Sequence, residues 1–244
     1  MISLFANRRW LPFTLILLLA IGLRLINLGG RALWYDEAFA VLFAEKGLSA
    51  MLYGTLTPVA GGAADIHPLL YYSTLNVWMH FFGESAFTVR LLSVIQGAAT
   101  VAVVYVLAKT LFDEKTGLVA ALITAVAPFH VQYSQETRMY ALLDLLLMAA
   151  SWCFVKAWRS DEIELTKRSL WIKWRYWLGF GVFAGLAMYT QQLAAFYLVA
   201  LGLVPFLARR RQQVVGVVVG TVTAIVVYLP WLVNLPGQLQ KVRS

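Results

Sequence analysis

Long apolar runs separated by short polar segments dominate this chain. About 20 apolar residues suffice for a helix to cross a bilayer. The pattern therefore predicts an all-α, polytopic membrane bundle of about seven spans, forming a single module over residues 1–244. Three of the runs are shorter than usual, so we expect them to border protein or a cavity, or to have ends elsewhere. The predicted spans are 10–28, 91–111, 117–131, 139–158, 176–191, 193–208 and 214–233.

One long segment, residues 29–90, interrupts the run of predicted spans. Its hydrophobic pattern predicts two interfacial helices, at 37–53 and 68–82, with Pro68 at the first helical position of the second. The apolar residues 68–82 could themselves cross the membrane, but they are short for a span. The connector 54–65 contains two adjacent glycines and is either an ordinary loop or a lid over a pocket at the membrane surface.

The composition indicates a membrane protein, with 61% hydrophobic and 13% charged residues and a mean hydropathy of +0.72. A net charge of +8 would suggest a nucleic-acid partner for a soluble domain, but here the distribution of charge indicates topology instead. If the N-terminus is cytoplasmic, the short inner segments carry 11 Lys and Arg residues and the much longer outer segments carry 6. This bias places segment 29–90 on the extracytoplasmic side, facing the lipid bilayer surface, and no nucleic-acid partner is expected.

Two adjacent acids, Asp36 and Glu37, follow the first predicted span and the helix-breaking pair Gly29-Gly30. Ionisable side chains at a bilayer boundary are costly unless they are solvated, paired or used. They could be solvated acids at a helix N-terminus, where negative charge is favourable. They could equally face a water-filled pocket, and the sequence alone leaves both readings open.

A second polar cluster, residues 132–140, lies at the predicted outer mouth between the third and fourth spans. Arg138 offers a planar, permanently charged fork that suits a phosphate oxyanion. The alternative is an interfacial arginine paired with Glu136. Within the fourth span, Asp144 needs a partner or a cavity, and we expect a structural hydrogen bond to a neighbouring helix.

Four motifs occur in a fixed order: Trp-Tyr-Asp-Glu-Ala at 34–38, His-Pro-Leu-Leu-Tyr-Tyr at 67–72, Phe-Thr-Val-Arg-Leu-Leu-Ser at 87–93 and Ser-Gln-Glu-Thr-Arg-Met-Tyr at 134–140. Their order and spacing resemble the integral-membrane glycosyltransferases that use polyprenyl-phosphate sugars. The chain is similar to the protein O-mannosyltransferase and aminoarabinose transferase group, family 39 of the GT-C fold. The resemblance covers nearly the whole chain but only the amino-terminal module of such enzymes.

The resemblance implies transfer of a sugar from a polyprenyl-phosphate donor to an acceptor hydroxyl on the extracytoplasmic face of the plasma (inner) membrane. Asp36 would be the general base of an inverting reaction, and Glu37 would orient it or contact a metal or the acceptor. Arg138, or alternatively Arg90, would stabilise the leaving phosphate. His67 could touch the phosphate, bind a metal or cap the second interfacial helix, and we favour the cap.

Four further residues become candidates for substrate binding through these motifs or their predicted position at an outer turn: Tyr71, Gln135, Glu136 and Gln191. No resident metal site is identified, and the cofactor stays unknown, with a divalent metal as one hypothesis. The acceptor could be a protein, a lipid or a glycan. A transporter or flippase of lipid-linked sugars, or a non-catalytic membrane subunit, remains as an alternative function.

Overall fold

The computed structural model describes residues 10–56, 67–160 and 167–233. All regular structure in these residues is helical, which confirms the predicted all-α fold. Part of the expected connector 54–65 lies outside the described residues, as do segments 1–9 and 234–244 of the predicted topology.

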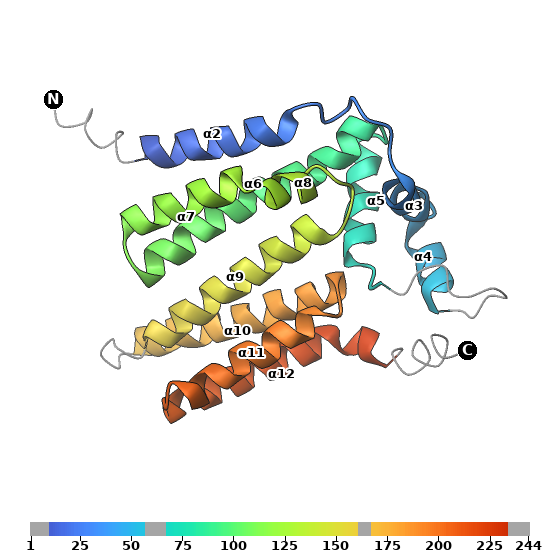
Figure 1. Cartoon of the computed structure of the whole chain (residues 1–244). Helices are drawn as coiled ribbons and strands as arrows, with labels where there is room; N and C mark the ends of the chain where they lie inside the picture. Colours follow the sequence, from blue (N-terminus) through green and yellow to red (C-terminus); the bar gives the residue numbers. More distant parts are fainter. Residues whose placement is uncertain (1–9, 57–66, 161–166, 234–244) are drawn as a thin grey trace.

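The body of the molecule is a layer of helices that run alongside one another (Figure 1). α2 packs against α6 and α7, α6 packs against α9, and α10 joins α9 to α12. Successive helices of this bundle run in opposite directions, so the two ends of the bundle carry alternate connections. The bundle helices are α2 (Leu11–Leu25), α6 (Ala86–Leu111), α7 (Glu114–Val126), α9 (Tyr140–Arg159), α10 (Lys167–Thr190), α11 (Ala194–Leu207) and α12 (Val214–Leu232).

Apolar outward-facing surfaces on these helices indicate a membrane environment. On α12, Val222, Val226 and Leu229 are all about half exposed or more, and large exposed apolar faces are unfavourable in water. In the described part of the chain, three helices are long and apolar enough to span a bilayer: α6, α9 and the stretch Arg211–Leu232. α2 and α11 are apolar but shorter, so the expected total of seven crossings stays a prediction.

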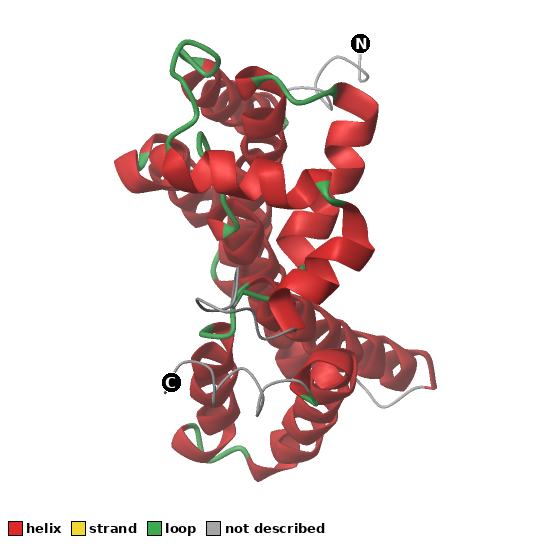
Figure 2. Cartoon of the chain, turned by 90° about the vertical axis from the view of Figure 1, so that its right-hand side faces the viewer, coloured by secondary structure: helices red, strands yellow, loops and turns green. Residues whose placement is uncertain are grey.

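Three helices lie across one end of the bundle rather than along it (Figure 1). They are α3 (Tyr35–Glu45), α4 (Gly47–Leu56) and α5 (Leu70–Phe82). Figure 2, which faces this end, shows them in front of the bundle helices. We call this group the end cap. Its orientation fits the interfacial position that the sequence predicted for segment 29–90.

Two details of the end cap differ from the sequence prediction. The helix expected over 37–53 is broken into α3 and α4 at Gly47, whose φ of +78° is one that residues with a side chain rarely adopt. The second helix begins at Leu70 with Leu69 as its N-cap, so neither Pro68 as the first helical residue nor His67 as the cap is correct.

Aromatic packing and two side-chain hydrogen bonds attach α5 to its neighbours. Phe43 of α3 meets the edge of the Tyr72 ring at 5.0 Å between centroids. The Asn76 amide donates to the carbonyl of Ala44 at 2.8 Å, and the Trp78 indole N–H donates to the carbonyl of Thr88 at 2.8 Å. Within the end cap, α5 is therefore fixed both to α3 and to the start of α6.

The third predicted span, 117–131, is interrupted. α7 ends at Val126, and the short α8 (Pro128–Tyr133) follows. Pro128 has no N–H, so it cannot bond the carbonyl of Thr124 four residues earlier. The guanidinium of Arg24 donates to the carbonyls of Thr124 and Ala125 at 3.4 and 3.0 Å. Arg24 is completely buried, so its charge lies inside the bundle rather than at the membrane surface.

The ends of two other predicted spans also moved. α10 begins at Lys167 rather than at 176, so the span predicted over 176–191 belongs to a longer helix. α6 begins at Ala86, where the Ser85 hydroxyl accepts from the backbone N–H of Thr88 at 3.2 Å. The added first turn of α6 carries Arg90 under the end cap.

Candidate active site

The two acids of segment 34–38 sit in the first turn of α3, where their charge complements the helix N-terminus. Trp34, in an extended conformation, is the N-cap residue. The Glu37 carboxylate turns back to accept the backbone N–H of Trp34 at 3.3 Å, as a capping-box glutamate does. Asp36 and Glu37 therefore leave the same helical turn towards different neighbours.

Glu37 forms a closed ion pair with Arg90. The guanidinium donates to both carboxylate oxygens, at 2.8 Å from Nε and 2.6 Å from Nη2, and both side chains are buried. Its other N–H groups donate to the carbonyls of Leu28, Arg31 and Ala32 at 2.8, 2.9 and 3.1 Å. Because arginine has five N–H donors, this arrangement uses all of them. Arg90 has no donor left for a phosphate here.

A third segment joins the same carboxylate. The backbone N–H of Thr137 donates to Glu37 at 2.8 Å, which connects α3 to the loop between α8 and α9. Burial alone would raise the pKa of Glu37, but the hydrogen bonds from Arg90 and Thr137 outweigh it and the pKa is lowered. Glu37 is thus an ionised clamp that holds α3, α6 and two loops together.

Asp36 belongs to a more open pair. Its carboxylate lies 3.5 Å from Nη2 of Arg138, with a side-chain exposure of 36% for Asp36 and 11% for Arg138. The Arg138 guanidinium also lies over the ring of Tyr140, 5.8 Å from its centroid. The N–O distance of this pair is longer than that of the Glu37–Arg90 clamp, and the pair is accessible to solvent. The Asp36 carboxylate is therefore accessible to an incoming hydroxyl group.

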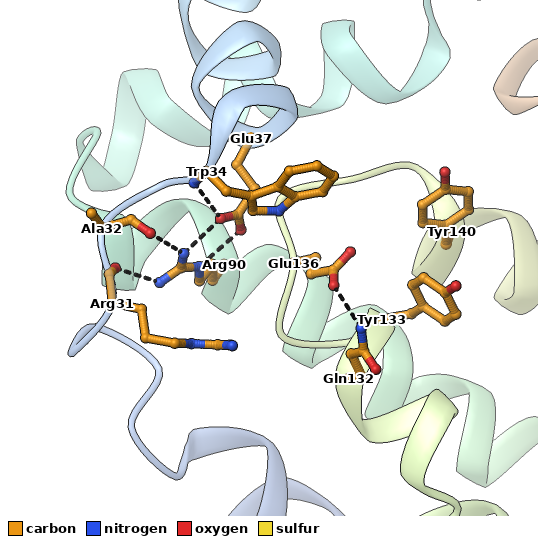
Figure 3. A pocket seen from close by; sticks show the side chains of 9 residues that line it. All are labelled: Arg31, Ala32, Trp34, Glu37, Arg90, Gln132, Tyr133, Glu136 and Tyr140. Carbon is orange, nitrogen blue, oxygen red and sulfur yellow. Dashed lines mark hydrogen bonds and ion pairs between the residues drawn. The ribbon is translucent and has the colours of Figure 1, made fainter.

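A cavity of about 520 Å³ opens beside the clamp (Figure 3). The loop before α3, the start of α6, and the segment from α8 to the start of α9 contribute its walls. Its lining mixes charged groups with aromatic rings, as small-molecule sites commonly do. The lining residues are Arg31, Ala32, Trp34, Glu37, Arg90, Gln132, Tyr133, Glu136 and Tyr140.

Asp36 and Arg138 are not among the lining residues, but they adjoin the cavity. Tyr140 lines the cavity and contacts Arg138, and Asp36 directly precedes the lining residue Glu37. Of the residues predicted from sequence, the structure therefore brings Asp36, Glu37, Arg90, Glu136 and Arg138 to one place. Their roles in substrate binding and catalysis remain predictions.

Glu136 and Gln135 have different surroundings although they are neighbours. Glu136 lines the cavity and accepts from the Gln132 amide at 3.3 Å, rather than pairing with Arg138. The Gln135 amide instead donates to the carbonyls of Arg24 and Ile26 at 3.1 and 3.0 Å. It thus satisfies the carbonyls left free where α2 ends, which is a structural contact.

The other predicted substrate ligands lie outside the cavity lining. Tyr71 of α5 is buried in the hydrophobic core of the end cap, and burial raises the pKa of its hydroxyl, so the side chain stays neutral. Gln191 lies in the turn between α10 and α11, and His67 lies just before α5. Neither lines the cavity.

A second polar network lies inside the bundle. Arg24 contacts His130 Nδ1 at 2.6 Å, and Nε2 of the same ring lies 3.2 Å from the Asp144 carboxylate. The expected partner of Asp144 on a neighbouring helix is therefore His130 of α8. This network braces the α7–α8 break. Among the described residues, no group of three or more His, Cys, Asp or Glu side chains is placed to hold a metal ion.

Sequence reasoning missed several cavity residues: Arg31, Trp34, Gln132, Tyr133 and Tyr140. All of them lie within or next to the motifs at 34–38 and 134–140. For Trp34, Tyr133 and Tyr140 the available signal was the density of aromatic residues in and beside those motifs.

Two comparisons relate this chain to known proteins. Residues 66–233 match the family model described as dolichyl-phosphate-mannose-protein mannosyltransferase. The chain is also 28% identical, over 224 residues, to an undecaprenyl phosphate-alpha-4-amino-4-deoxy-L-arabinose arabinosyl transferase of Pseudomonas aeruginosa (strain LESB58). That alignment covers 88% of this chain and 39% of the relative, so the chain spans well under half of the relative's length.

Proposed function

This chain belongs to the dolichyl-phosphate-mannose-protein mannosyltransferase family, and on that premise we propose that it transfers a sugar from a polyprenyl-phosphate donor to an acceptor hydroxyl. The name of the Pseudomonas aeruginosa relative, which specifies an undecaprenyl phosphate-linked sugar, supports a lipid-linked donor. Mannose and 4-amino-4-deoxy-L-arabinose are therefore the first two sugars to test.

The observation that carries the proposal is the position of the cavity. It lies at the end-cap side of an apolar bundle and is lined by charged and aromatic side chains. A lipid-linked donor needs such a boundary, because its polyprenyl chain stays in the bilayer while its sugar phosphate stays hydrated. The half-exposed Asp36 adjoins this cavity.

In the proposed reaction, the acceptor O–H gives its proton to the Asp36 carboxylate while its oxygen bonds the anomeric carbon. The bond from that carbon to the phosphate oxygen breaks, and the electron pair leaves with the polyprenyl phosphate. A single displacement of this kind inverts the anomeric centre. Glu37 is less suited to be the base, because its oxygens are occupied by Arg90 and two backbone N–H groups.

Arg138 has a positioning role in this scheme. Its guanidinium holds the Asp36 carboxylate at the cavity edge and is itself supported by Tyr140. The long 3.5 Å contact leaves room for the acceptor hydroxyl to compete for the carboxylate.

The proposed location is the plasma (inner) membrane with the end cap on the extracytoplasmic side. The distribution of Lys and Arg supports this orientation, since segment 209–213, which carries three arginines, joins α11 to α12 at the opposite end of the bundle.

The test uses the full chain reconstituted into vesicles with a polyprenyl-phosphate donor whose sugar is radiolabelled. Label should move to an added acceptor, and an equal amount of polyprenyl phosphate should be released. Intact labelled lipid crossing the bilayer without cleavage would replace the proposal with a flippase. If neither occurs with mannose or 4-amino-4-deoxy-arabinose donors and a hydroxyl acceptor, the proposal fails for this chain acting alone.

A further inference from the structure

Two arginines line the cavity, and they differ in how far their charge is already used. Arg90 donates all its N–H groups within the clamp. Arg31 is exposed, and its guanidinium forms no hydrogen bond or ion pair with the described residues. Figure 3 shows the Arg31 side chain extending towards the wall that carries Gln132 and Glu136. Arg31 is therefore the lining cation that is available to a ligand.

The backbone that carries Arg31 is fixed by the clamp. Nη1 of Arg90 donates to the Arg31 carbonyl at 2.9 Å and to the Leu28 carbonyl at 2.8 Å. The loop before α3 is thus attached to α6, although the Arg31 side chain is not. A charged group on an anchored backbone loses less conformational entropy on binding than one on a loose loop.

The geometry of a single displacement decides where the phosphate belongs. The attacking oxygen and the leaving phosphate lie on opposite sides of the anomeric carbon. Asp36, the proposed base, is in contact with Arg138, and Arg138 lies against Tyr140. A phosphate held by Arg138 would therefore lie beside the base. Figure 3 shows Arg31 and Tyr140 at opposite sides of the cavity.

We propose that Arg31 binds the phosphate of the lipid-linked donor, an assignment that rests on the proposed function. The sugar then occupies the cavity between Arg31 and Tyr140. Glu136 and Gln132, which contact each other at 3.3 Å, face the sugar hydroxyls. Trp34, 49% exposed, offers an aromatic face against which a sugar ring packs.

The experiment measures equilibrium binding to the purified full chain in detergent micelles, without any transfer reaction. The probes are a polyprenyl phosphate, the matching polyprenol and inorganic phosphate. Wild-type protein should prefer the lipid phosphate to the polyprenol. Arg31→Gln should lower the affinity for the lipid phosphate about tenfold or more, the effect of losing a charge-assisted hydrogen bond, and leave polyprenol binding unchanged. The affinity of Arg31→Lys for the lipid phosphate should lie between those of wild type and Arg31→Gln.

Arg211→Gln is the matched control, because it removes one exposed positive charge at the other end of the bundle. It should bind like wild type. Unchanged lipid-phosphate binding in Arg31→Gln would overturn the assignment. The assignment would also be overturned if Arg138→Gln, and not Arg31→Gln, abolished the preference for the lipid phosphate over the polyprenol. It would be overturned as well if inorganic phosphate competed for the site as strongly as the polyprenyl phosphate. If wild-type protein itself shows no preference for the phosphate, the proposed function fails rather than the assignment of Arg31.

Discussion

At the scale of single residues, two adjacent acids have separate tasks because they face different arginines. Glu37 is buried and held by Arg90, whereas Asp36 is half exposed beside Arg138. A buried ion pair with every donor satisfied organises its surroundings but has little capacity to react. An exposed carboxylate can exchange its partner. The difference in burial favours a structural role for Glu37 and supports the proposed catalytic role of Asp36.

The clamp predicts a large effect of Glu37→Gln on stability. The amide keeps the size of the side chain but leaves the buried Arg90 charge without its counterion, which typically costs about 3–5 kcal/mol. Thermal unfolding of the purified protein in detergent measures the loss. Glu84→Gln, which changes an exposed acid near the same end, is the control. Equal stability of the two variants would show that the clamp contributes little.

The same clamp should weaken in acid. The pKa of Glu37 is lowered in the folded protein, so its contribution is fully present above the ordinary glutamate pKa of about 4.3 and is lost as the pH falls through the folded value. The stability gap between wild type and Glu37→Gln should therefore narrow below about pH 4. A gap that stays constant down to pH 3 would contradict the assigned ionisation.

At the scale of elements, the long bundle helices were predictable and the breaks were not. The apolar runs of α6, α9 and α12 fix those helices within a few residues. The residues on either side of Gly47 continue one hydrophobic pattern, so its positive φ is invisible in the periodicity. Pro128 did signal an interruption, but its partner Arg24 lies about a hundred residues away in sequence.

The break between α3 and α4 allows a direct test of whether Gly47 is needed there for its positive φ. Gly47→Ala meets no atom within 4 Å but forces a side chain into a left-handed conformation, at a cost of about 1–2 kcal/mol. Gly22→Ala is the matched control, since Gly22 has equally open surroundings within the α2 helix. Thermal unfolding should show a loss for the first variant and none for the second. An equal change in thermal stability in both variants would show that the positive φ of Gly47 is not the cause of the loss.

The candidate site was also predictable only in part, because its residue pairs depend on contacts between segments far apart in the sequence. The motifs located the acids and Arg138, because chemistry-bearing residues at the expected outer face stand out in an apolar chain. Which acid meets which arginine depends on the packing of α6 under the end cap, and local sequence does not contain that information. Arg31 was overlooked because a single arginine after two glycines has no distinctive pattern.

At the scale of the whole molecule, the account requires the end cap to face outwards. Cysteine substituted for the exposed Glu84 should react with a membrane-impermeant thiol reagent added to intact cells. Cysteine substituted for the exposed Lys115, in the first turn of α7 at the other end, should react only after permeabilisation. The native Cys153 is buried and serves as the unreactive background. The reverse labelling pattern would place the candidate site on the cytoplasmic side.

The central claim is that Asp36 accepts the proton of the acceptor during sugar transfer. The most direct measurement compares single-turnover transfer by wild type and Asp36→Asn, with donor binding measured on the same samples. Asparagine preserves size but accepts no proton, so the transfer rate should fall about 10²–10⁴-fold while donor affinity is retained. Glu84→Gln should transfer at the wild-type rate. A near-normal rate of sugar transfer by folded Asp36→Asn would contradict the account and make Glu136 the next candidate for the base.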